Sequence, residues 1–421
     1  MTSIELDMIQ TAGIGALALI VGMVLTRKVA FLQRFCVPSP VSGGIIFSLI
    51  TLALYGWFGV EVSFDDTLKD VFMLAFFTSV GFQSDMKVIR QGGRSLVIML
   101  VLLVVMITMQ NLMPVGIARL MGVSPLIGMA AGSIPMTGGH GTVGGFASVL
   151  EGMGLQGAGT IGMAAATFGL IAGSMIGGPL AEKIIRTKLT HEQVQQDVEI
   201  DPAMAGIESD EASPTGRTKR ISTNEQEFQQ YAKATYCILL VMGGGTLLSW
   251  LLAKTGITFP TYFGNLILAA ITRNTLGFVS YKEDGKWVKA DNLLDMERII
   301  SVGNICLSLF LGMAMISLKL WELQNLALPL IAILVSQIVM MALFAYFAAF
   351  PLLGRDYDAA VLCAGICGFG LGATPNAMAN MSAVCYKYHY AVKPFLIVPI
   401  IGAMFADLIN TAIITLFLNV I

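Results

Sequence analysis

Two short glycine-rich stretches, one in each half of the chain, constrain the fold more than any other feature. They read AGSIPMTGGHGT at 131–142 and AGICGFGLGATPN at 364–376, and an Ala-Gly pair precedes Gly139 and Gly372 at the same spacing. The rest of the chain is strongly apolar, with 56% hydrophobic and 12% charged residues. Backbone rich in Gly, Pro and Thr cannot face lipid, because its peptide groups would lack hydrogen-bond partners. The sequence therefore predicts a membrane protein in which both stretches are covered by protein or line a water-filled cavity.

Apolar segments near the length of roughly 17–25 residues that a bilayer requires predict the spanning helices. They lie near 9–26, 37–57, 71–85, 95–115, 158–181, 232–253, 258–273, 298–317, 326–350 and 394–418. The glycine-rich stretches, extended to about 123–148 and 358–386, are predicted to enter the bilayer and return as re-entrant hairpins. We predict an all-α membrane protein with ten transmembrane helices, in two repeats of five helices and one hairpin each. The repeats cover 1–185 and 231–421, and a polar linker at 186–230 joins them.

The basic residues predict the orientation. With the N-terminus outside, all but four of the 25 Lys and Arg residues fall on the cytoplasmic side, as the positive-inside rule requires. The four others are Lys69, Arg119, Lys254 and Lys319. Five spans per half place both termini outside, the linker in the cytoplasm, and the second repeat upside down relative to the first. Pro40–Gly44 and Pro260–Gly264 are a further echo between the halves.

Broken helices at corresponding places of an inverted repeat are typical of secondary transporters. Glycine-rich tips can direct backbone N–H groups inward, and helix N-termini add partial positive charge, so an anion is the expected ligand. The residues expected to provide these groups are Gly138, Gly139, Gly141, Thr142, Gly372, Ala373, Thr374 and Asn376. The alternative is that these glycines only permit close helix packing.

Polar side chains inside apolar spans are the other candidates, because such residues are costly in a membrane. His140 is interpreted as a substrate contact, a proton site, or a neutral ring that orients the hairpin. Asp407 is interpreted as a partner of a substrate ammonium, a sodium ligand or a structural pair, and Asn410 lies one turn further on. Oxygen-bearing residues in the third and eighth spans are predicted to hold a cation or to bond between helices. They are Thr78, Ser79, Gln83, Asn304 and Ser308.

Enzymatic chemistry finds little support, because the chain contains no GxSxG, HExxH or Walker A motif. We predict that the protein is not an enzyme. The alternatives are a membrane-embedded hydrolase using Asp407, Asp358 or His140, and a passive channel. No cofactor beyond a coupling ion and no nucleic-acid partner are expected.

Several segments together resemble the bacterial sodium/glutamate symporter family over nearly the whole chain. They are PSPVSGG at 38–44, LAFFTSVGF at 74–82, GSIPMTGGHGT at 132–142, ATFGLIAGSMIGGP at 166–179, VGNICLSLFLGMAMISLKLWEL at 302–323, DYDAAVLCAGICGFGLGATPNAMANM at 356–381 and FLIVPIIGAMFADLIN at 395–410. The resemblance implies a homodimer in the bacterial plasma membrane that couples inward L-glutamate movement to Na⁺ at a site where the two loops meet. Pro135, Thr137, Ile366 and Asn376 depart from the usual family pattern. A sodium-coupled carrier of a related amino acid or dicarboxylate is therefore the alternative. Thr137 is also expected to belong to the substrate site.

An elevator-like movement is expected to expose such a site alternately. In this hypothesis 123–181 and 358–418 move together with parts of the third and eighth spans. The second, fourth, seventh and ninth spans form the scaffold.

Overall fold

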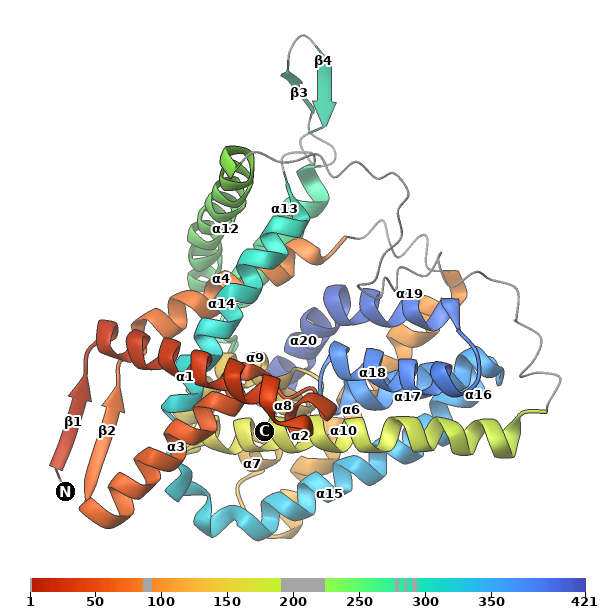
Figure 1. Ribbon diagram of the computed structural model, residues 1–421, viewed down its shortest axis with the longest axis horizontal. Coiled ribbons are helices and arrows are strands. Elements are labelled where there is room, and N and C mark those ends of the chain that lie inside the picture. The colour runs from red at the N-terminus through yellow and green to blue at the C-terminus, as the bar shows by residue number, and fades with distance from the viewer. Residues whose placement is uncertain (1, 86–92, 191–223, 277–279, 284–285, 290–293) are drawn as a thin grey trace.

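The computed structural model describes residues 2–85, 93–190, 224–276, 280–283, 286–289 and 294–421 (Figure 1). The elements of its first half are β1 (Thr2–Leu6), α1 (Met8–Lys28), α2 (Ala30–Arg34), α3 (Ser39–Phe58), β2 (Val60–Phe64), α4 (Thr67–Gln83), α6 (Gly93–Leu120), α7 (Pro125–Ala130), α8 (Ser133–Met136), α9 (Gly139–Gly152) and α10 (Ala158–Lys188). Those of its second half are α12 (Asn224–Ala253), α13 (Phe263–Leu276), β3 (Ser280–Glu283), β4 (Lys286–Lys289), α14 (Met296–Ile316), η3 (Leu320–Leu326), α15 (Ala327–Leu343), η4 (Phe344–Ala349), α16 (Phe350–Leu353), α17 (Tyr357–Gly370), α18 (Thr374–Lys387), α19 (Val392–Ile400), η5 (Ile401–Phe405) and α20 (Ala406–Leu418).

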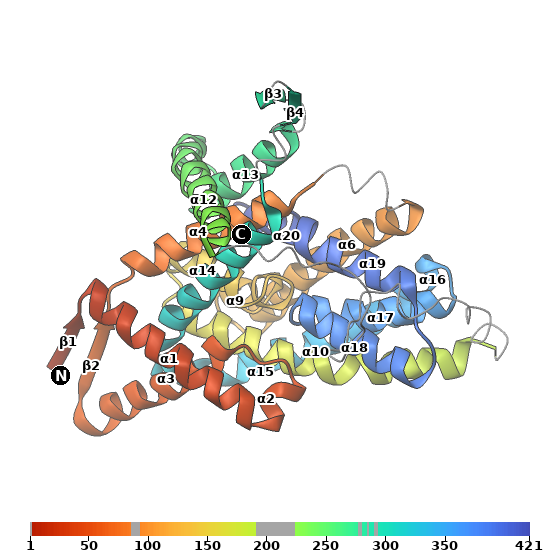
Figure 2. The ribbon, with the colours of Figure 1, turned by 45° about the horizontal axis from the view of Figure 1, so that its top comes forward.

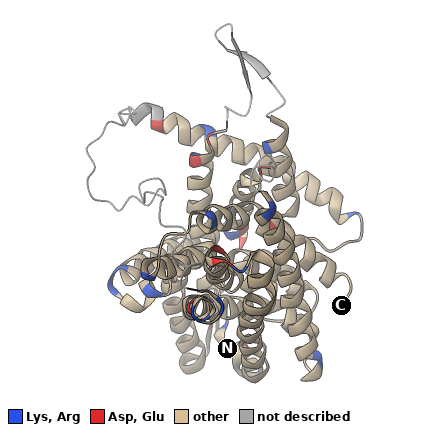
Figure 3. Ribbon diagram, turned by 90° about the vertical axis from the view of Figure 1, so that its right-hand side faces the viewer, with Lys and Arg blue, Asp and Glu red and all other residues tan. Residues whose placement is uncertain are grey.

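The prediction of a helical, multi-pass membrane protein is confirmed. Helix occupies each of the ten apolar segments, and within the described residues seven helices are long and apolar enough to cross a bilayer. They are Met8–Lys28, Ser39–Phe58, Gly93–Leu120, Ala158–Lys188, Glu227–Ala253, Met296–Ile316 and Ala327–Leu353. Most helices in Figure 3 carry neither charge colour along almost their whole length. Such surfaces suit a hydrocarbon environment.

Two small sheets correct the expectation of a purely helical chain. Strands β1 and β2 pair in parallel with Thr2 opposite Val60, and β3 and β4 pair antiparallel with Ser280 opposite Lys289. Their β-branched and aromatic residues favour extended backbone. Helix also covers both ends of the stretch predicted as a linker, because α10 continues to Lys188 and α12 begins at Asn224. The middle of that stretch, 191–223, lies outside the described residues.

Local signals in the sequence explain several helix ends. Asp7 and Gln10 form a reciprocal capping box at the start of α1, and the Asp356 side chain accepts a hydrogen bond from the Ala359 amide at the start of α17. Both arrangements satisfy amides that have no partner within the helix. Gly59 ends α3 in a left-handed conformation with φ +64°. The chain therefore marks its helix ends with ordinary capping chemistry.

The helices pack as two bundles, which lie side by side in Figures 1 and 2. The first bundle consists of α1, α3, α4, α12, α13 and α14, with α4 packed along α14 at its centre. The second bundle consists of α6 to α10 and α15 to α20, and it contains most of the large hydrophobic core. A smaller core lies between α4, α12, α13 and α14. This division differs from the expected grouping, because the fourth and ninth spans (α6 and α15) pack with the glycine-rich segments. The third and eighth spans (α4 and α14) form the centre of the first bundle.

The connection from α14 of the first bundle to α15 of the second runs through η3. Trp321 of η3 stacks on Tyr55 of α3, with ring centroids 4.1 Å apart and planes 3° from parallel. This stack holds the connecting segment against a helix of the first bundle.

Candidate functional site

A cavity of about 260 Å³ lies between the two bundles and brings both glycine-rich stretches together. One wall is polar and comes entirely from the second bundle, where the polar lining side chains are Thr137, His140, Thr142, Thr374 and Asp407. The other wall is apolar and comes from the first bundle and the residue before α3, through Phe76, Phe77, Leu307, Leu311 and Pro38. The polar groups able to bind a charged solute are thus all carried on one bundle.

The two tips meet because glycine permits close approach of their backbones. Gly139 has φ +64°, a left-handed conformation that other residues adopt at a cost, and a methyl group there would lie 3.3 Å from the Gly372 carbonyl oxygen. Helix α9 begins at Gly139 and α18 begins at Thr374, with Pro375 in its first turn. Two helix N-termini therefore open at the cavity, where their amides and partial positive charge favour an anion.

Most residues predicted for the substrate site line this cavity. They are Thr137, Gly138, Gly139, His140, Gly141, Thr142, Gly372, Ala373, Thr374 and Asp407. The other two, Asn376 and Asn410, are buried beside it and serve as anchors. Asn376 Nδ2 donates to the Leu170 carbonyl of α10 at 2.8 Å, and Asn410 Nδ2 donates to the Ser133 carbonyl of α8 at 3.1 Å.

His140 is buried at the first tip and bonds to a neighbouring helix, not to its own segment. Its Nε2 lies 3.0 Å from Thr167 Oγ1, and that hydroxyl donates to the Met163 carbonyl at 2.9 Å. His140 Nε2 and the Thr167 hydroxyl are hydrogen-bond partners, and the tautomer of the ring sets which of them donates. The ring therefore fastens the tip to α10 while also facing the cavity.

Asp407 enters the cavity from the first turn of α20, directly after the π-helical segment η5. Segment η5 passes close to the second tip, since a methyl group on Gly402 would lie 2.2 Å from Thr374 Oγ1. π-Helical turns inside α-helices are common at functional sites. Among the described residues that line this cavity, Asp407 is the only acid.

The other residues predicted to hold sodium are not gathered at this cavity. The hydroxyls of Thr78 and Ser79 donate to the Leu74 and Phe76 carbonyls of their own helix at 2.7 Å each. Gln83 and Ser308 also donate to carbonyls one turn back, those of Ser79 and Asn304. Asn304 is exposed on α14, and a methyl group on Gly303 would lie 1.9 Å from Ser79 Oγ. In this structure the side chains of Thr78, Ser79, Gln83 and Ser308 bond carbonyls of their own helices, and Ser79 packs against Gly303 of α14.

Sequence reasoning missed two buried glutamines and an asparagine that hold the broken segments. Gln110 of α6 accepts a hydrogen bond from Thr137 Oγ1 at 2.6 Å and donates to the Gly370 carbonyl. Gln337 of α15 donates to the Gln110 and Ala131 carbonyls at 2.9 and 3.3 Å. Asn111 bonds both the amide and the hydroxyl of Ser133. The available signals were the adjacent amides Gln110 and Asn111 and the single amide Gln337, each inside an apolar span.

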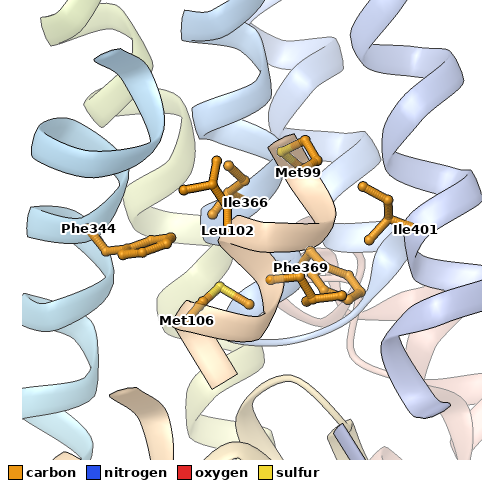
Figure 4. A pocket seen from close by; sticks show the side chains of 8 residues that line it. Met99, Leu102, Met106, Phe344, Ile366, Phe369 and Ile401 are labelled. Atoms are coloured by element: carbon orange, nitrogen blue, oxygen red, sulfur yellow. The ribbon is translucent and has the colours of Figure 1, made fainter. Parts of the chain in front are cut away.

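Two further hollows flank the site. Figure 4 shows the smaller, about 20 Å³, whose wall is formed by Met, Leu, Ile and Phe side chains behind the second tip; Phe369 lines both this hollow and the main cavity. The larger, about 520 Å³, lies at the other end of α9 and is lined by acids including Asp70, Glu151 and Glu322. Burial raises the pKa of the Glu322 carboxyl, nearby Lys319 opposes that rise, and Glu151 and Glu61 add to it.

A set of apolar helices whose two broken segments line one polar interior cavity defines a multi-pass membrane protein with a solute-sized site. The family model for sodium/glutamate symporters matches residues 4–390. The sodium/glutamate symporter of Escherichia coli strain K12 is 39% identical over 416 residues, covering 98% of each chain. That of Haemophilus influenzae is 36% identical over 405 residues, covering 96% of this chain and 95% of the relative.

The chain therefore belongs to the sodium/glutamate symporter family, and the expected resemblance is confirmed. These relatives are named as transporters and not as enzymes. A solved structure of a sodium proton antiporter from Methanocaldococcus jannaschii aligns over 98% of this chain and 94% of that chain. It is 14% identical with a TM-score of 0.41, a likeness too distant to inform the argument.

Proposed function

We propose that this protein is a secondary active transporter that couples the inward movement of L-glutamate to Na⁺. The observation that carries the proposal is the cavity at which both tips and Asp407 converge. Tip amides and two helix N-termini would receive the carboxylates, and Asp407 would receive the ammonium group or a sodium ion. The sodium/glutamate symporters related to this chain support both the substrate and the coupling ion.

Uptake into liposomes tests this function. The purified protein is reconstituted and supplied with labelled glutamate, aspartate and related dicarboxylates under an imposed sodium gradient. We expect saturable glutamate accumulation that requires sodium, and loss of that accumulation in Asp407→Asn. Equal uptake in potassium-only buffer would refute sodium coupling, equilibration without accumulation would indicate a channel, and product formation would indicate an enzyme.

We further propose that the two halves are inverted repeats of five spans and one re-entrant hairpin. Helix packing supports this, because neighbours occur in corresponding sets: α1 with α3 and α12 with α13, α3 with α14 and α13 with α4. Helices α4 and α14 correspond to each other and pack together, as elements on a two-fold axis would. In the proposed orientation both termini lie outside the cell and the central linker lies in the cytoplasm of a plasma-membrane homodimer.

The polar wall of the cavity supports an elevator mechanism with a revised division of the chain. We propose that the second bundle carries the site and slides past the first bundle, whose wall offers only apolar side chains. A cysteine replacing Thr142 is expected to react with an impermeant thiol reagent from opposite sides as sodium and substrate are varied. Reaction from one side under all conditions would contradict a moving site, and cross-linking of cysteines introduced at exposed positions of the first bundle tests the dimer.

A further inference from the structure

The direction of one hydrogen bond at the first tip is fixed by its neighbours. The Gly370 carbonyl can only accept, so the Gln110 amide nitrogen must face it. Gln110 Oε1 is thereby turned toward Thr137, and an amide oxygen can also only accept. The Thr137 hydroxyl, 2.6 Å away, must therefore be the donor. Gln110 is fully buried, so water does not compete for these bonds.

This direction determines what Thr137 can offer to a ligand. Thr137 lines the cavity, and with its proton committed to Gln110 its hydroxyl can offer a ligand there only oxygen lone pairs. A carboxylate needs donors and gains nothing there. An ammonium group has three donors and is matched by such an acceptor.

One backbone carbonyl links the segment that carries Thr137 to the helix that carries the cavity's acid, Asp407. The Ser133 carbonyl accepts from the Thr137 amide at 3.2 Å and from Asn410 Nδ2 at 3.1 Å. Thr137 lies one turn beyond Ser133, and Asp407 lies one turn before Asn410 on α20. One carbonyl thus joins the turn that holds Thr137 to the helix that holds Asp407, and both side chains line the same cavity.

We propose that Thr137 and Asp407 form a subsite for the α-ammonium group, and that Gln110 is the positioning residue that fixes Thr137 as an acceptor. This inference rests on the proposed function and explains how its site would select an amino acid over a dicarboxylate without an amino group. A dicarboxylate without an amino group would leave the buried acceptors unpaired, which is costly. Gln110 therefore sets specificity without touching the substrate.

Gln337 provides a matched control. It is also a buried glutamine of a spanning helix, and it holds the Gln110 and Ala131 backbone carbonyls. None of its hydrogen bonds in the described residues involves the Thr137 hydroxyl. Replacing it disturbs the same region without freeing the proton of Thr137.

The experiment compares L-glutamate with glutarate, which has the same two carboxylates and no amino group. Sodium-driven glutamate uptake into liposomes gives KM, and glutarate inhibition of that uptake gives its apparent affinity. The variants are Thr137→Val, Thr137→Ser, Gln110→Met and Gln337→Met, each checked for a monodisperse profile in detergent. The measured quantity is the ratio of glutamate to glutarate affinity.

We expect wild type and Thr137→Ser to prefer glutamate strongly. Thr137→Val and Gln110→Met should each lower the ratio by about tenfold to a hundredfold, the value of one hydrogen bond to a charged group. Gln337→Met should lower turnover and leave the ratio within about twofold of wild type, because it does not touch the acceptor.

Three results would overturn the subsite: a wild-type protein that binds glutarate as tightly as glutamate, a Thr137→Val ratio equal to wild type, or equal effects of Gln110→Met and Gln337→Met. If Gln110→Met does not fold, the two Thr137 variants decide. Absence of sodium-dependent glutamate uptake by the wild type would instead refute the proposed function, and the two failures are thus distinguished.

Discussion

The first broken segment (125–152) and the second (357–387) differ in where the groups that hold them originate. Neighbouring helices reach into the first: Asn111, Asn410 and Gln337 all bond its backbone. The second receives one such bond, from Gln110 to the Gly370 carbonyl, and otherwise reaches outward with its own side chains, since Asn376 and Asn380 donate to carbonyls of α10. The first also lies against α6, whereas the two arms of the second lie against each other.

This difference shows that the same backbone shape can be stabilised by opposite donor arrangements. Burying a broken helix leaves peptide groups without partners, and those partners can come from either side of the contact. The first segment should therefore depend on residues elsewhere in the chain. The second should depend mainly on its own sequence.

The largest expected effect is at the contact between the arms of the second segment. In Gly368→Ala the added methyl would lie 2.6 Å from the Ala377 amide nitrogen and 2.7 Å from its Cα. Because these are backbone atoms, relieving the clash requires the helix itself to shift. We expect uptake to fall by at least about tenfold and the unfolding temperature to drop, because overpacking costs about 1–3 kcal/mol or more. Gly178→Ala is the control, since nothing lies within 4 Å there. Wild-type uptake and unfolding temperature in Gly368→Ala would refute the tight contact.

A second test compares Asn111, which reaches from α6 into the first segment, with Asn380, which reaches from the second segment to α10. Asn111→Leu removes the acceptor of the Ser133 amide and leaves that buried amide unpaired, at a cost of about 1–3 kcal/mol. Asn380→Leu removes a donor to two carbonyls that lie inside helices. We expect Asn111→Leu to lower the unfolding temperature more than Asn380→Leu, as measured by thermal unfolding in detergent. The reverse order would show that both segments are held alike.

The bond between His140 of the first segment and Thr167 of α10 is expected to contribute less to stability than these anchors. Thr167→Val removes the hydrogen-bond partner of His140 Nε2, and we expect a loss of about 1 kcal/mol and a few-fold lower uptake. Thr167→Ser keeps the hydroxyl and should behave as wild type. If Thr167→Val transports normally, the ring is not held by this bond.

The smallest effects are expected from charged side chains near the ends of the two segments. Glu322 of η3 lines the hollow beside the end of α9, and Lys387 is the last residue of α18. Because the pKa of Glu322 is raised in the folded protein, its protonation favours folding at low pH, and this contribution is lost as the pH rises through the folded value. Glu322→Gln should therefore raise the free energy of unfolding at pH 7 by less than about 1 kcal/mol after solvent screening, seen as a slightly higher unfolding temperature, with no such rise at pH 4. At the second segment, Lys387→Met breaks an exposed ion pair with Glu182 and should have little effect at either pH. An equal shift in Glu322→Gln at both pH values would contradict the burial of this carboxyl.

The sequence predicted the convergence of the tips well, because glycine at membrane depth and a lone intramembrane acid each have few explanations. Gly139, Gly372 and Asp407 do line one cavity. The helix positions were also predictable from apolar length. The substrate and sodium roles of these residues stay predictions.

Other features depend on contacts that no local pattern contains. Gln110 looks like any amide in an apolar run, and only the fold shows that it bonds Thr137 and Gly370. Thr78 and Ser308 were grouped because they are oxygen-bearing, but each bonds its own helix. Which bundle α4 and α14 join likewise follows from side-chain packing over long sequence separations.

The stack of Tyr55 on Trp321 makes this tryptophan an intrinsic fluorescent reporter of movement. Tyr55 lies on α3 of the first bundle, Trp321 lies on the segment that joins α14 of the first bundle to α15 of the second, and the chain has only four tryptophans. A sliding movement that carries this joining segment along with the second bundle would separate rings that are 4.1 Å apart and change the surroundings of the indole. The emission of Trp321 would then follow the displacement in real time without any attached dye, in a variant whose other three indoles are replaced.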